Sequence, residues 1–89
     1  MSKLNLIEAQ LKVLANSRRL GMLLYLRRNK SATVQELADA VGITICGASQ
    51  HLRSLRSAGI IEFRKRGLYV INRISLKKNE ILREILRAI

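Results

Sequence analysis

The chain has 89 residues and a formal net charge of +11, from 17 lysines and arginines against 6 acidic residues. A chain of this length has room for one domain, so residues 1–89 are expected to form a single folding unit. No apolar run approaches the roughly 20 residues that span a bilayer, so no membrane-spanning segment is expected. The positive excess predicts a polyanionic partner, either nucleic acid or an anionic membrane surface.

The cysteine content and the N-terminal residues indicate the cellular compartment of the protein. The single cysteine, Cys46, excludes an internal disulfide framework and fits a reducing cytosol. The N-terminal run is interrupted by Glu8, Gln10 and Lys12, which argues against a signal peptide. The protein is therefore expected to be cytoplasmic and associated with the nucleoid.

Two helices are expected in the N-terminal third of the chain. The first carries a narrow apolar seam with spacings of 3, 4 and 3 residues, formed by Leu4, Ile7, Leu11 and Leu14. Asn16 or Ser17 can cap a second helix that runs to about Arg28. Gly21 lowers the helix propensity of this segment by roughly 1 kcal/mol, which a close crossing with another helix would compensate.

The next segment has the signals of a helix-turn-helix. Thr33 and Glu36 form a capping box that starts a third helix, and Gly42 supplies the left-handed turn that ends it after Val41. Thr44 then caps a fourth helix, expected over residues 44–57, which stops at Gly59. The short turn between two capped helices is typical of this motif.

A hairpin and a final helix are expected after Gly59. Residues 60–64 and 68–74 are rich in β-branched and aromatic types, and the link Lys65-Arg66-Gly67 is short enough for a hairpin. Ser75 is expected to cap a last helix with an apolar stripe, formed by Leu76, Ile81, Leu82, Ile85, Leu86 and Ile89. The predicted fold is mainly α with a small β-hairpin (α+β): a winged helix-turn-helix with four helices, two strands and a closing helix.

The helix over residues 44–57 separates an apolar face from a polar one. On a wheel of 100° per residue, the residues expected to pack inward are Ile45, Ala48, Leu52 and Leu55. The opposite face and its flanks carry small and polar residues, namely Cys46, Gly47, Ser49, Gln50, His51, Arg53 and Ser54. Gln50 can pair with adenine, Ser49 can contact a base or a phosphate, and Arg53 can reach guanine or the backbone. This face is expected to enter the major groove. The alternative is an ordinary solvated helix face.

The hairpin tip Arg64-Lys65-Arg66-Gly67 is basic and too polar to pack. Contact with phosphates or with the minor groove is its expected use, and the alternative is a basic turn that protects a hairpin edge. Together the two elements give the predicted DNA-binding residues Thr44, Cys46, Gly47, Ser49, Gln50, Arg53, Arg64, Lys65 and Arg66.

From Leu14 to Ile74 the chain resembles the ArsR/SmtB family of bacterial and archaeal winged-helix repressors. The resemblance is carried, in order, by LANSRRLGMLLYL, VQELADAVGIT, ASQHLRSLRSAGII and RGLYVINRI. It implies a homodimer built on the first and last helices, an operator with dyad symmetry, and repression that an effector relieves. It also implies DNA contact through the wing and through Ile45, Cys46, Ser49 and Gln50. Ile45 departs from the polar residue common at its position.

The apolar stripes of the two terminal helices suggest a dimer interface on their own. Such helices on a small domain leave more apolar surface than one core absorbs. The predicted interface residues are Leu4, Ile7, Leu11, Leu14, Ile81, Leu82, Ile85 and Leu86. The alternative, above all for the last helix, is that the stripe completes the core of the monomer. Two-fold symmetry would place the recognition helices about 34 Å apart, facing successive major grooves.

No metal site is expected, although many members of the family sense metals. Residues 34–39 contain no cysteine and residues 76–89 contain no histidine. Cys46 and His51 lie about 140° apart around their helix and do not converge on one ion. Glu80 and Glu84 lack nitrogen or sulfur partners for a transition metal, and charge balance with neighbouring cations is the simpler reading. We expect neither a metal nor another cofactor.

Cys46 is the remaining sensor candidate. It is expected in the first turn of a helix near basic groups, where the reactive thiolate is favoured. Oxidation there would add bulk or charge at the DNA surface, while the cysteine of a dimer mate would lie too far away for a disulfide. The alternative is a small residue tolerated at the contact surface.

These features favour a dimeric, sequence-specific transcriptional regulator, and a repressor first. The alternative is an architectural or scaffold winged-helix protein that binds nucleic acid with little sequence preference, which the high charge and the lack of a visible effector site would suit. RNA binding is less favoured because only Tyr25, Phe63 and Tyr69 are aromatic. One histidine, one cysteine and no Gly-rich phosphate loop argue against an enzyme.

Overall fold

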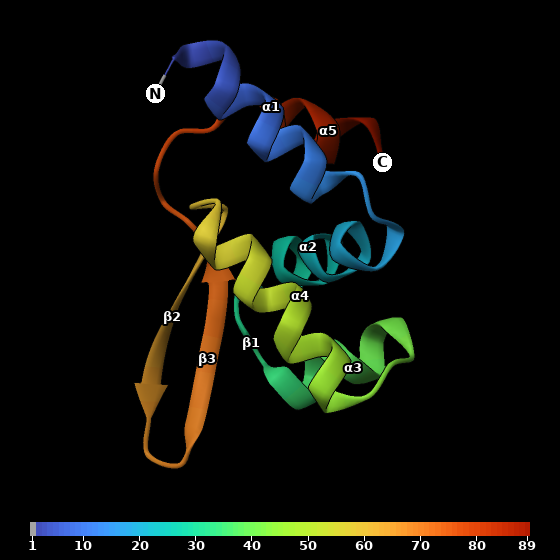
Figure 1. Cartoon of the computed structure of the whole chain (residues 1–89). Helices are drawn as coiled ribbons and strands as arrows, with labels where there is room; N and C mark the ends of the chain where they lie inside the picture. Colours follow the sequence, from blue (N-terminus) through green and yellow to red (C-terminus); the bar gives the residue numbers. More distant parts are fainter. Residues whose placement is uncertain (1) are drawn as a thin grey trace.

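The computed structural model describes residues 2–89 as five helices and a small three-stranded sheet (Figure 1). In chain order the elements are α1 (Lys3–Leu14), α2 (Ser17–Asn29), β1 (Ala32–Thr33), α3 (Val34–Val41), α4 (Ile45–Ser57), β2 (Ile61–Arg66), β3 (Tyr69–Ile74) and α5 (Glu80–Ala88). The sheet is antiparallel with the order β1-β3-β2. The predicted winged helix-turn-helix is confirmed.

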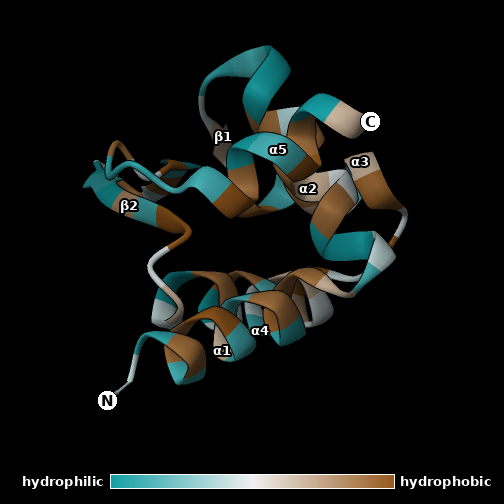
Figure 2. Ribbon diagram, turned by 90° about the horizontal axis from the view of Figure 1, so that it is seen from above, coloured by the Kyte–Doolittle hydropathy of each residue, from teal (hydrophilic) through white to brown (hydrophobic). Residues whose placement is uncertain are grey.

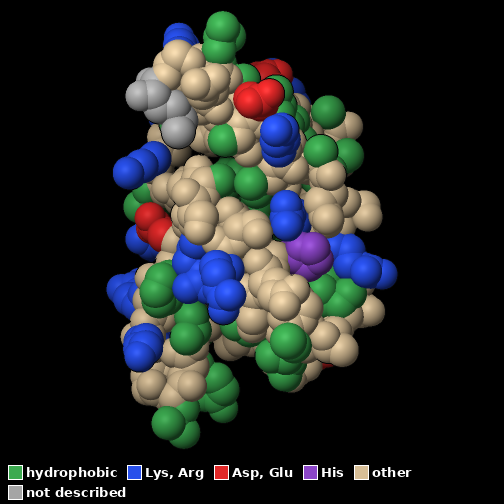
Figure 3. All heavy atoms as spheres, viewed as in Figure 1, with side chains coloured by type: hydrophobic (Ala, Val, Ile, Leu, Met, Phe, Trp, Pro, Cys, Tyr) green, Lys and Arg blue, Asp and Glu red, His purple; other side chains and the backbone are tan. Residues whose placement is uncertain are grey.

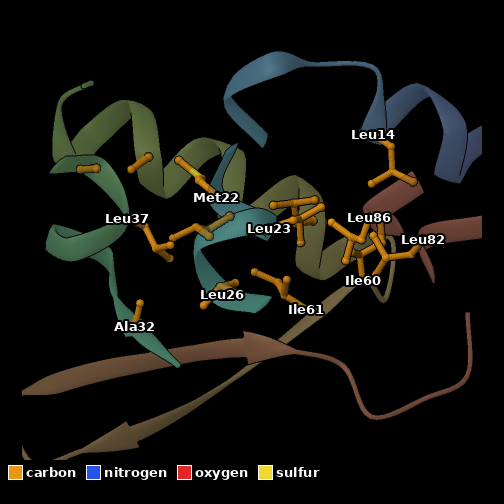
Figure 4. Packing of buried hydrophobic residues seen from close by; sticks show 14 residues of the cluster. Leu14, Met22, Leu23, Leu26, Ala32, Leu37, Ile60, Ile61, Leu82 and Leu86 are labelled. Carbon is orange, nitrogen blue, oxygen red and sulfur yellow. The ribbon is translucent and has the colours of Figure 1, made fainter. Parts of the chain in front are cut away.

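Helix α2 is the centre of the hydrophobic core. Asn16 caps it by accepting hydrogen bonds from the backbone N–H groups of Arg18 and Arg19. The helix contributes Met22, Leu23 and Leu26, which are fully buried among side chains from the other elements (Figure 4). Helices are banded with hydrophobic and hydrophilic residues, as expected when one face packs inward (Figure 2).

Gly21 lies where α2 crosses α3, as its sequence context predicts. A Cβ atom at this position would lie 2.9 Å from Cγ1 of Val41, which is closer than side chains normally approach. The missing side chain therefore lets the two helices pack closely, and this packing compensates for the helix propensity that glycine lacks.

The caps of the helix-turn-helix are those expected from the sequence. The Thr33 hydroxyl accepts from the backbone N–H of Glu36, whose carboxylate accepts from the N–H of Thr33. Gly42 ends α3 with a φ of 70°. Thr44 caps α4 by accepting from the N–H of Gly47 at 3.0 Å. These bonds fix both ends of the turn that joins the two helices.

Strand β1 is absent from the sequence-based prediction. It has only two residues, Ala32 and Thr33, and its partner is β3 in the register Ala32↔Asn72. Asn72 is fully buried, and its side-chain Nδ2 donates to the carbonyl of Ala32. Two residues carry no strand periodicity, so only the tertiary pairing reveals this strand.

The hairpin turn lies further along the chain than predicted. Lys65 and Arg66 belong to β2, and the register Arg66↔Tyr69 leaves Gly67 and Leu68 as the turn. Gly67 has a φ of 63°, which a two-residue hairpin loop requires and glycine adopts without strain. The cations therefore lie on the ladder, and the tip carries an apolar residue instead.

The last helix also begins later than predicted. Ser75 does not cap it; the Ser75 hydroxyl accepts from the N–H of Lys77 in a local turn. Asn79 caps α5 by accepting from the N–H of Leu82, so the helix starts at Glu80. Leu76 lies in the intervening loop with 80% of its surface exposed. Asn79 lies directly before the apolar stripe of α5 and caps the helix, whereas Ser75 lies further from that stripe.

The terminal helices contribute to the core of a single chain more than the dimer prediction assumed. Leu14, Leu82 and Leu86 meet at one end of the core and are 3–7% exposed (Figure 4). Arg27 of α2 also donates a hydrogen bond to the carbonyl of Leu86. For these three leucines the burial favours the alternative that they complete the core of the monomer over the predicted dimer contact.

Helices α1 and α5 lie at the end of the molecule opposite the hairpin tip (Figure 1). Among residues 2–89, no helix combines the length and apolar character needed to cross a membrane.

Candidate nucleic-acid interface

Helix α4 presents a polar ridge along its solvent side. Cys46, Gln50 and Arg53 are exposed, and they fall within about 60° of one another around the helix axis. Ala48, Leu52 and Leu55 on the opposite side have no exposed surface. The predicted inward and outward faces are therefore confirmed for these residues, and the ridge extends for about 10 Å along the helix.

Two further predicted contact residues lie at the start of α4. The Thr44 hydroxyl oxygen accepts a hydrogen bond as the N-cap, and its O–H remains available as a donor because the side chain is exposed. A Cβ at Gly47 would lie 3.3 Å from Oγ1 of Thr44, so glycine lets the cap close tightly. Thr44 and Gly47 thus shape the helix end that carries the ridge.

Ile45 is not in the core, contrary to the wheel-based prediction. It is 50% exposed, whereas Ile43 in the preceding turn packs against the core cluster. Ile43 therefore takes the position against the core that the wheel assigned to Ile45, and Ile45 lies outside the core. Ile45 therefore adds an apolar surface beside Cys46 at the tip of the helix, where the family resemblance implies DNA contact.

Arg19 is a positioning residue that sequence reasoning missed. Its guanidinium donates to the carbonyl of Val13 in α1, to Nδ1 of His51 and to the hydroxyl of Ser54, at 3.1–3.3 Å. The Ser54 hydroxyl in turn donates to the carbonyl of Gln50 at 3.3 Å. One side chain of α2 therefore connects α1 to α4 on the flank beside the exposed ridge. Only the polar pair His51 and Ser54 on that flank hinted at such a partner.

His51 accepts from Arg19 and is therefore held in its neutral form. Burial, and after it the positive charges of Arg19 and Arg18, lowers the pKa of His51 below its usual value of 6.5. Because Nδ1 accepts the hydrogen bond, the neutral ring carries its proton on Nε2. Protonation of Nδ1 would remove this acceptor and place two cations side by side.

The predicted wing cations lie on both faces of the hairpin. Arg64 and Arg66 alternate with Lys65 along β2, so they project on the opposite face of the sheet. Arg64 and Arg66 line a hollow together with Lys30, the C-cap residue of α2. All three wing cations are exposed. The hairpin is therefore basic on either side, rather than at its tip.

The base of the wing is attached to α4. The guanidinium of Arg56 lies over the ring of Phe63, 4.3 Å from its centroid. On the other face, Nε of Arg73 donates to Oε1 of Glu62 at 2.6 Å across the two strands. The cation–π contact fixes the base of the wing relative to α4. Neither contact reaches the hairpin tip.

The N-terminal end of α4 and the tip of the wing point to the same end of the molecule (Figure 1). Basic side chains are spread over the face seen in Figure 3, where acidic ones are few. A surface with one projecting polar helix and one projecting basic hairpin can enter two neighbouring grooves of a duplex.

The metal-ligating residue types are dispersed in the described part of the chain, where no three His, Cys, Asp or Glu side chains gather into a group able to hold an ion. Glu80 and Glu84 instead lie within 3.2 and 3.6 Å of Lys78 and Arg87. Cys46 is a free, exposed thiol. Its redox role stays a prediction.

Comparison with known proteins agrees with this geometry. Residues 14–63 match the family of helix-turn-helix domains. The HTH-type transcriptional regulator Rv0324 of Mycobacterium tuberculosis is 39% identical over 64 residues, which make up 72% of this chain and 28% of that protein. The chain thus spans little more than a quarter of that relative's length.

Solved structures extend the similarity to nearly the whole chain. The homodimeric winged helix-turn-helix DNA-binding domain Mb0332 of Mycobacterium bovis, described as a possible ArsR-family regulator, is 29% identical with a TM-score of 0.79, over 99% of this chain and 82% of that one. The transcriptional repressor BigR of Xylella fastidiosa is 27% identical with a TM-score of 0.79, over 97% of this chain and 84% of that one. The family match covers more than half of the chain, and the folds agree from α1 to α5. The chain therefore belongs to the helix-turn-helix domain family, and its winged helix-turn-helix fold is that of ArsR/SmtB-type regulators.

Proposed function

We propose that the protein is a dimeric, sequence-specific DNA-binding regulator of transcription that acts as a repressor. The observation that carries this proposal is the common direction of the α4 N-terminus and the wing, with a polar ridge on one and cations on the other. The ridge enters the major groove, where Ser49 and Gln50 read base edges and Arg53 contacts a base or the backbone. The wing holds the flanking backbone and minor groove through Arg64, Lys65 and Arg66.

Dimerisation is proposed through α1 and α5. Mb0332 is a homodimer, and α1 of this chain leaves Leu4, Leu6 and Leu11 45–78% exposed. Ile7, Ile81 and Ile85 are half-buried, and Ile89 is 56% exposed at the C-terminus. The proposed interface therefore keeps five of the eight predicted residues, namely Leu4, Ile7, Leu11, Ile81 and Ile85, and adds Leu6 and Ile89.

Repression is proposed by similarity to BigR, which is a transcriptional repressor. A protein that covers its operator blocks the polymerase without further machinery, and a small domain is sufficient for this mode of repression.

The exposed thiol of Cys46 is tested by a gel shift with diamide: a redox sensor loses binding, and Cys46→Ser does not. Unchanged binding by the wild-type protein would exclude that role.

The second candidate is an architectural winged-helix protein, favoured by the net charge of +11. Such a protein binds mainly through phosphates, so its affinity falls steeply with salt and differs little between sequences. The two functions predict opposite results when selected and random duplexes compete at moderate salt. A sequence-specific repressor prefers the selected duplex, whereas an architectural protein binds both duplexes alike.

The test is selection of bound sequences from a random DNA pool, followed by competition between selected and random duplexes. A repressor yields a consensus with dyad symmetry whose half-sites are about one helical turn apart. Analytical ultracentrifugation of the same sample should give a dimer that Leu4→Lys with Leu11→Lys converts to monomers. Selection without any consensus would contradict the repressor function and favour the architectural one.

A further inference from the structure

The tip of the wing carries an apolar side chain that the fold leaves without a contact. Leu68 has 99% of its surface exposed, and Tyr69 beside it has 65%. A single exposed leucine is ordinary on a protein surface. Leu68 differs because it lies in the turn at the tip of the hairpin, separated only by Gly67 from three consecutive cations.

The hairpin is built to hold this side chain outward. Gly67 takes the positive φ of the two-residue turn, at 63°, while Leu68 keeps a negative φ. This pattern is that of a hairpin loop with glycine at its first central position, which matches the twist of the strands. Leu68 is therefore displayed without backbone strain, and side chains of similar size can replace it.

The distribution of charge around the tip fits the minor groove of a duplex. That groove is about 6 Å wide, so a two-stranded hairpin does not fit inside and only its tip can enter. Both walls of the groove are lined by phosphates. Arg66 projects from one face of the hairpin and Lys65 from the other, so each faces one wall when the tip points at the groove.

We infer that Leu68 is a wedge that enters the minor groove and partly unstacks one base step, while Arg66 and Lys65 hold the two phosphate walls. Apolar side chains that enter the minor groove commonly separate base pairs and bend the duplex away from themselves. The inference rests on the proposed DNA-binding function. It adds a residue that acts on DNA shape, whereas Gln50 and Ser49 act on base edges. Steps that unstack easily, such as TA, are its expected targets.

The test uses the full chain and duplexes with 2-aminopurine placed in turn at each flanking step, in the selected sequence or otherwise in TA-rich DNA. Fluorescence of the probe rises when its step unstacks. Wild-type protein should raise it at one step beside each half-site and shorten the end-to-end distance measured by energy transfer between dyes. Leu68→Ser should lose both signals, whereas Leu68→Met should keep them. The affinity of Leu68→Ser for DNA should fall by no more than about tenfold, because a variant without the wedge also avoids the free-energy cost of unstacking the base step.

Leu76→Ser is the matched control, because Leu76 is also an exposed leucine but lies in the loop before α5. It should leave both signals unchanged. Tight binding by wild-type protein without any rise in fluorescence, or a rise that Leu68→Ser retains, would overturn the wedge and leave the DNA-binding function standing. Absence of DNA binding would reject the proposed function and the wedge together.

Discussion

Helix α4 and the wing are both proposed to contact DNA, but the fold holds them in different ways. Helix α4 has a fully buried inner face, a capped N-terminus and a flank attached to Arg19. The distal wing, residues 63–69, is exposed throughout and depends on the strand ladder and on the Arg56–Phe63 contact at its base. Base reading requires fixed donors and acceptors, whereas phosphate and groove-shape contacts tolerate adjustment. The rigid element is therefore suited to specificity and the free one to affinity and DNA shape.

The largest expected effect is a loss of folding stability when the buried face of α4 is disrupted. Leu52→Ala removes a side chain with no exposed surface from the inner face of α4. We expect a loss of about 2–5 kcal/mol in the free energy of unfolding, measured by urea denaturation. Tyr69→Ala in the wing, where the side chain is 65% exposed, should cost less than about 1 kcal/mol. Similar losses in the two variants would show that the wing is as much part of the cooperative core as α4.

Next in size is the removal of the guanidinium that connects α1 to α4. Arg19→Ala loses the bonds to Val13, His51 and Ser54, and we expect a loss of about 1–3 kcal/mol in the free energy of unfolding. Arg19→Lys should not restore stability, because an ammonium cannot reproduce the planar fork. Arg18→Ala changes an exposed neighbour and is the control. Full stability of the Arg19→Lys variant would mean that charge alone, rather than geometry, matters.

A smaller effect is expected from the titration of His51. Because its folded pKa is lowered, the unfolded chain takes up the proton first as the pH falls. The stabilisation is therefore complete above the unfolded pKa, near 6.5, and is lost as the pH falls through the lower folded pKa. His51→Asn keeps an acceptor near the position of Nδ1 but does not titrate. Thermal unfolding between about pH 7.5 and about pH 5 should show a steeper decline for wild-type protein than for this variant. Parallel profiles would exclude His51 as the source.

The smallest effect concerns the salt dependence of DNA binding. Arg66→Ala should reduce the slope of log Kd against log salt by about 0.9 for each wing, or about 1.8 for a dimer on DNA. Folding should be unaffected because the side chain is exposed. Glu62→Gln, whose carboxylate pairs with Arg73 at the base of the wing, provides a comparison away from the tip. An unchanged slope for Arg66→Ala would show that Arg66 does not contact phosphate.

The sequence predicts the rigid half of the molecule better than the free half. The capping box at Thr33, the turn glycine Gly42 and the Thr44 cap are local signals, and each acts through neighbours in the chain. The apolar period of α4 likewise identifies its buried face, apart from Ile45 at the helix end. Local chemistry therefore determines both the boundaries and the orientation of the helix-turn-helix.

Features that depend on contacts between distant parts of the chain cannot be predicted from such local signals. The position of the hairpin turn follows from the β2–β3 register, and strand β1 follows from pairing with β3. Arg19 looks like one more exposed cation until α1 and α4 are placed beside it. The burial of Leu82 and Leu86 likewise depends on where α5 docks, because an apolar stripe alone does not distinguish a core from a dimer contact.

The most direct test of this division of roles compares Gln50→Ala and Arg66→Ala on selected and random duplexes at one salt concentration. Gln50→Ala should lower the ratio of selected to random affinity by about tenfold or more, because a paired contact to a base is lost. Arg66→Ala should weaken binding to both duplexes by the same factor and leave the ratio unchanged. Equal effects of the two substitutions on both duplexes would contradict the assignment of base reading to α4 and anchoring to the wing.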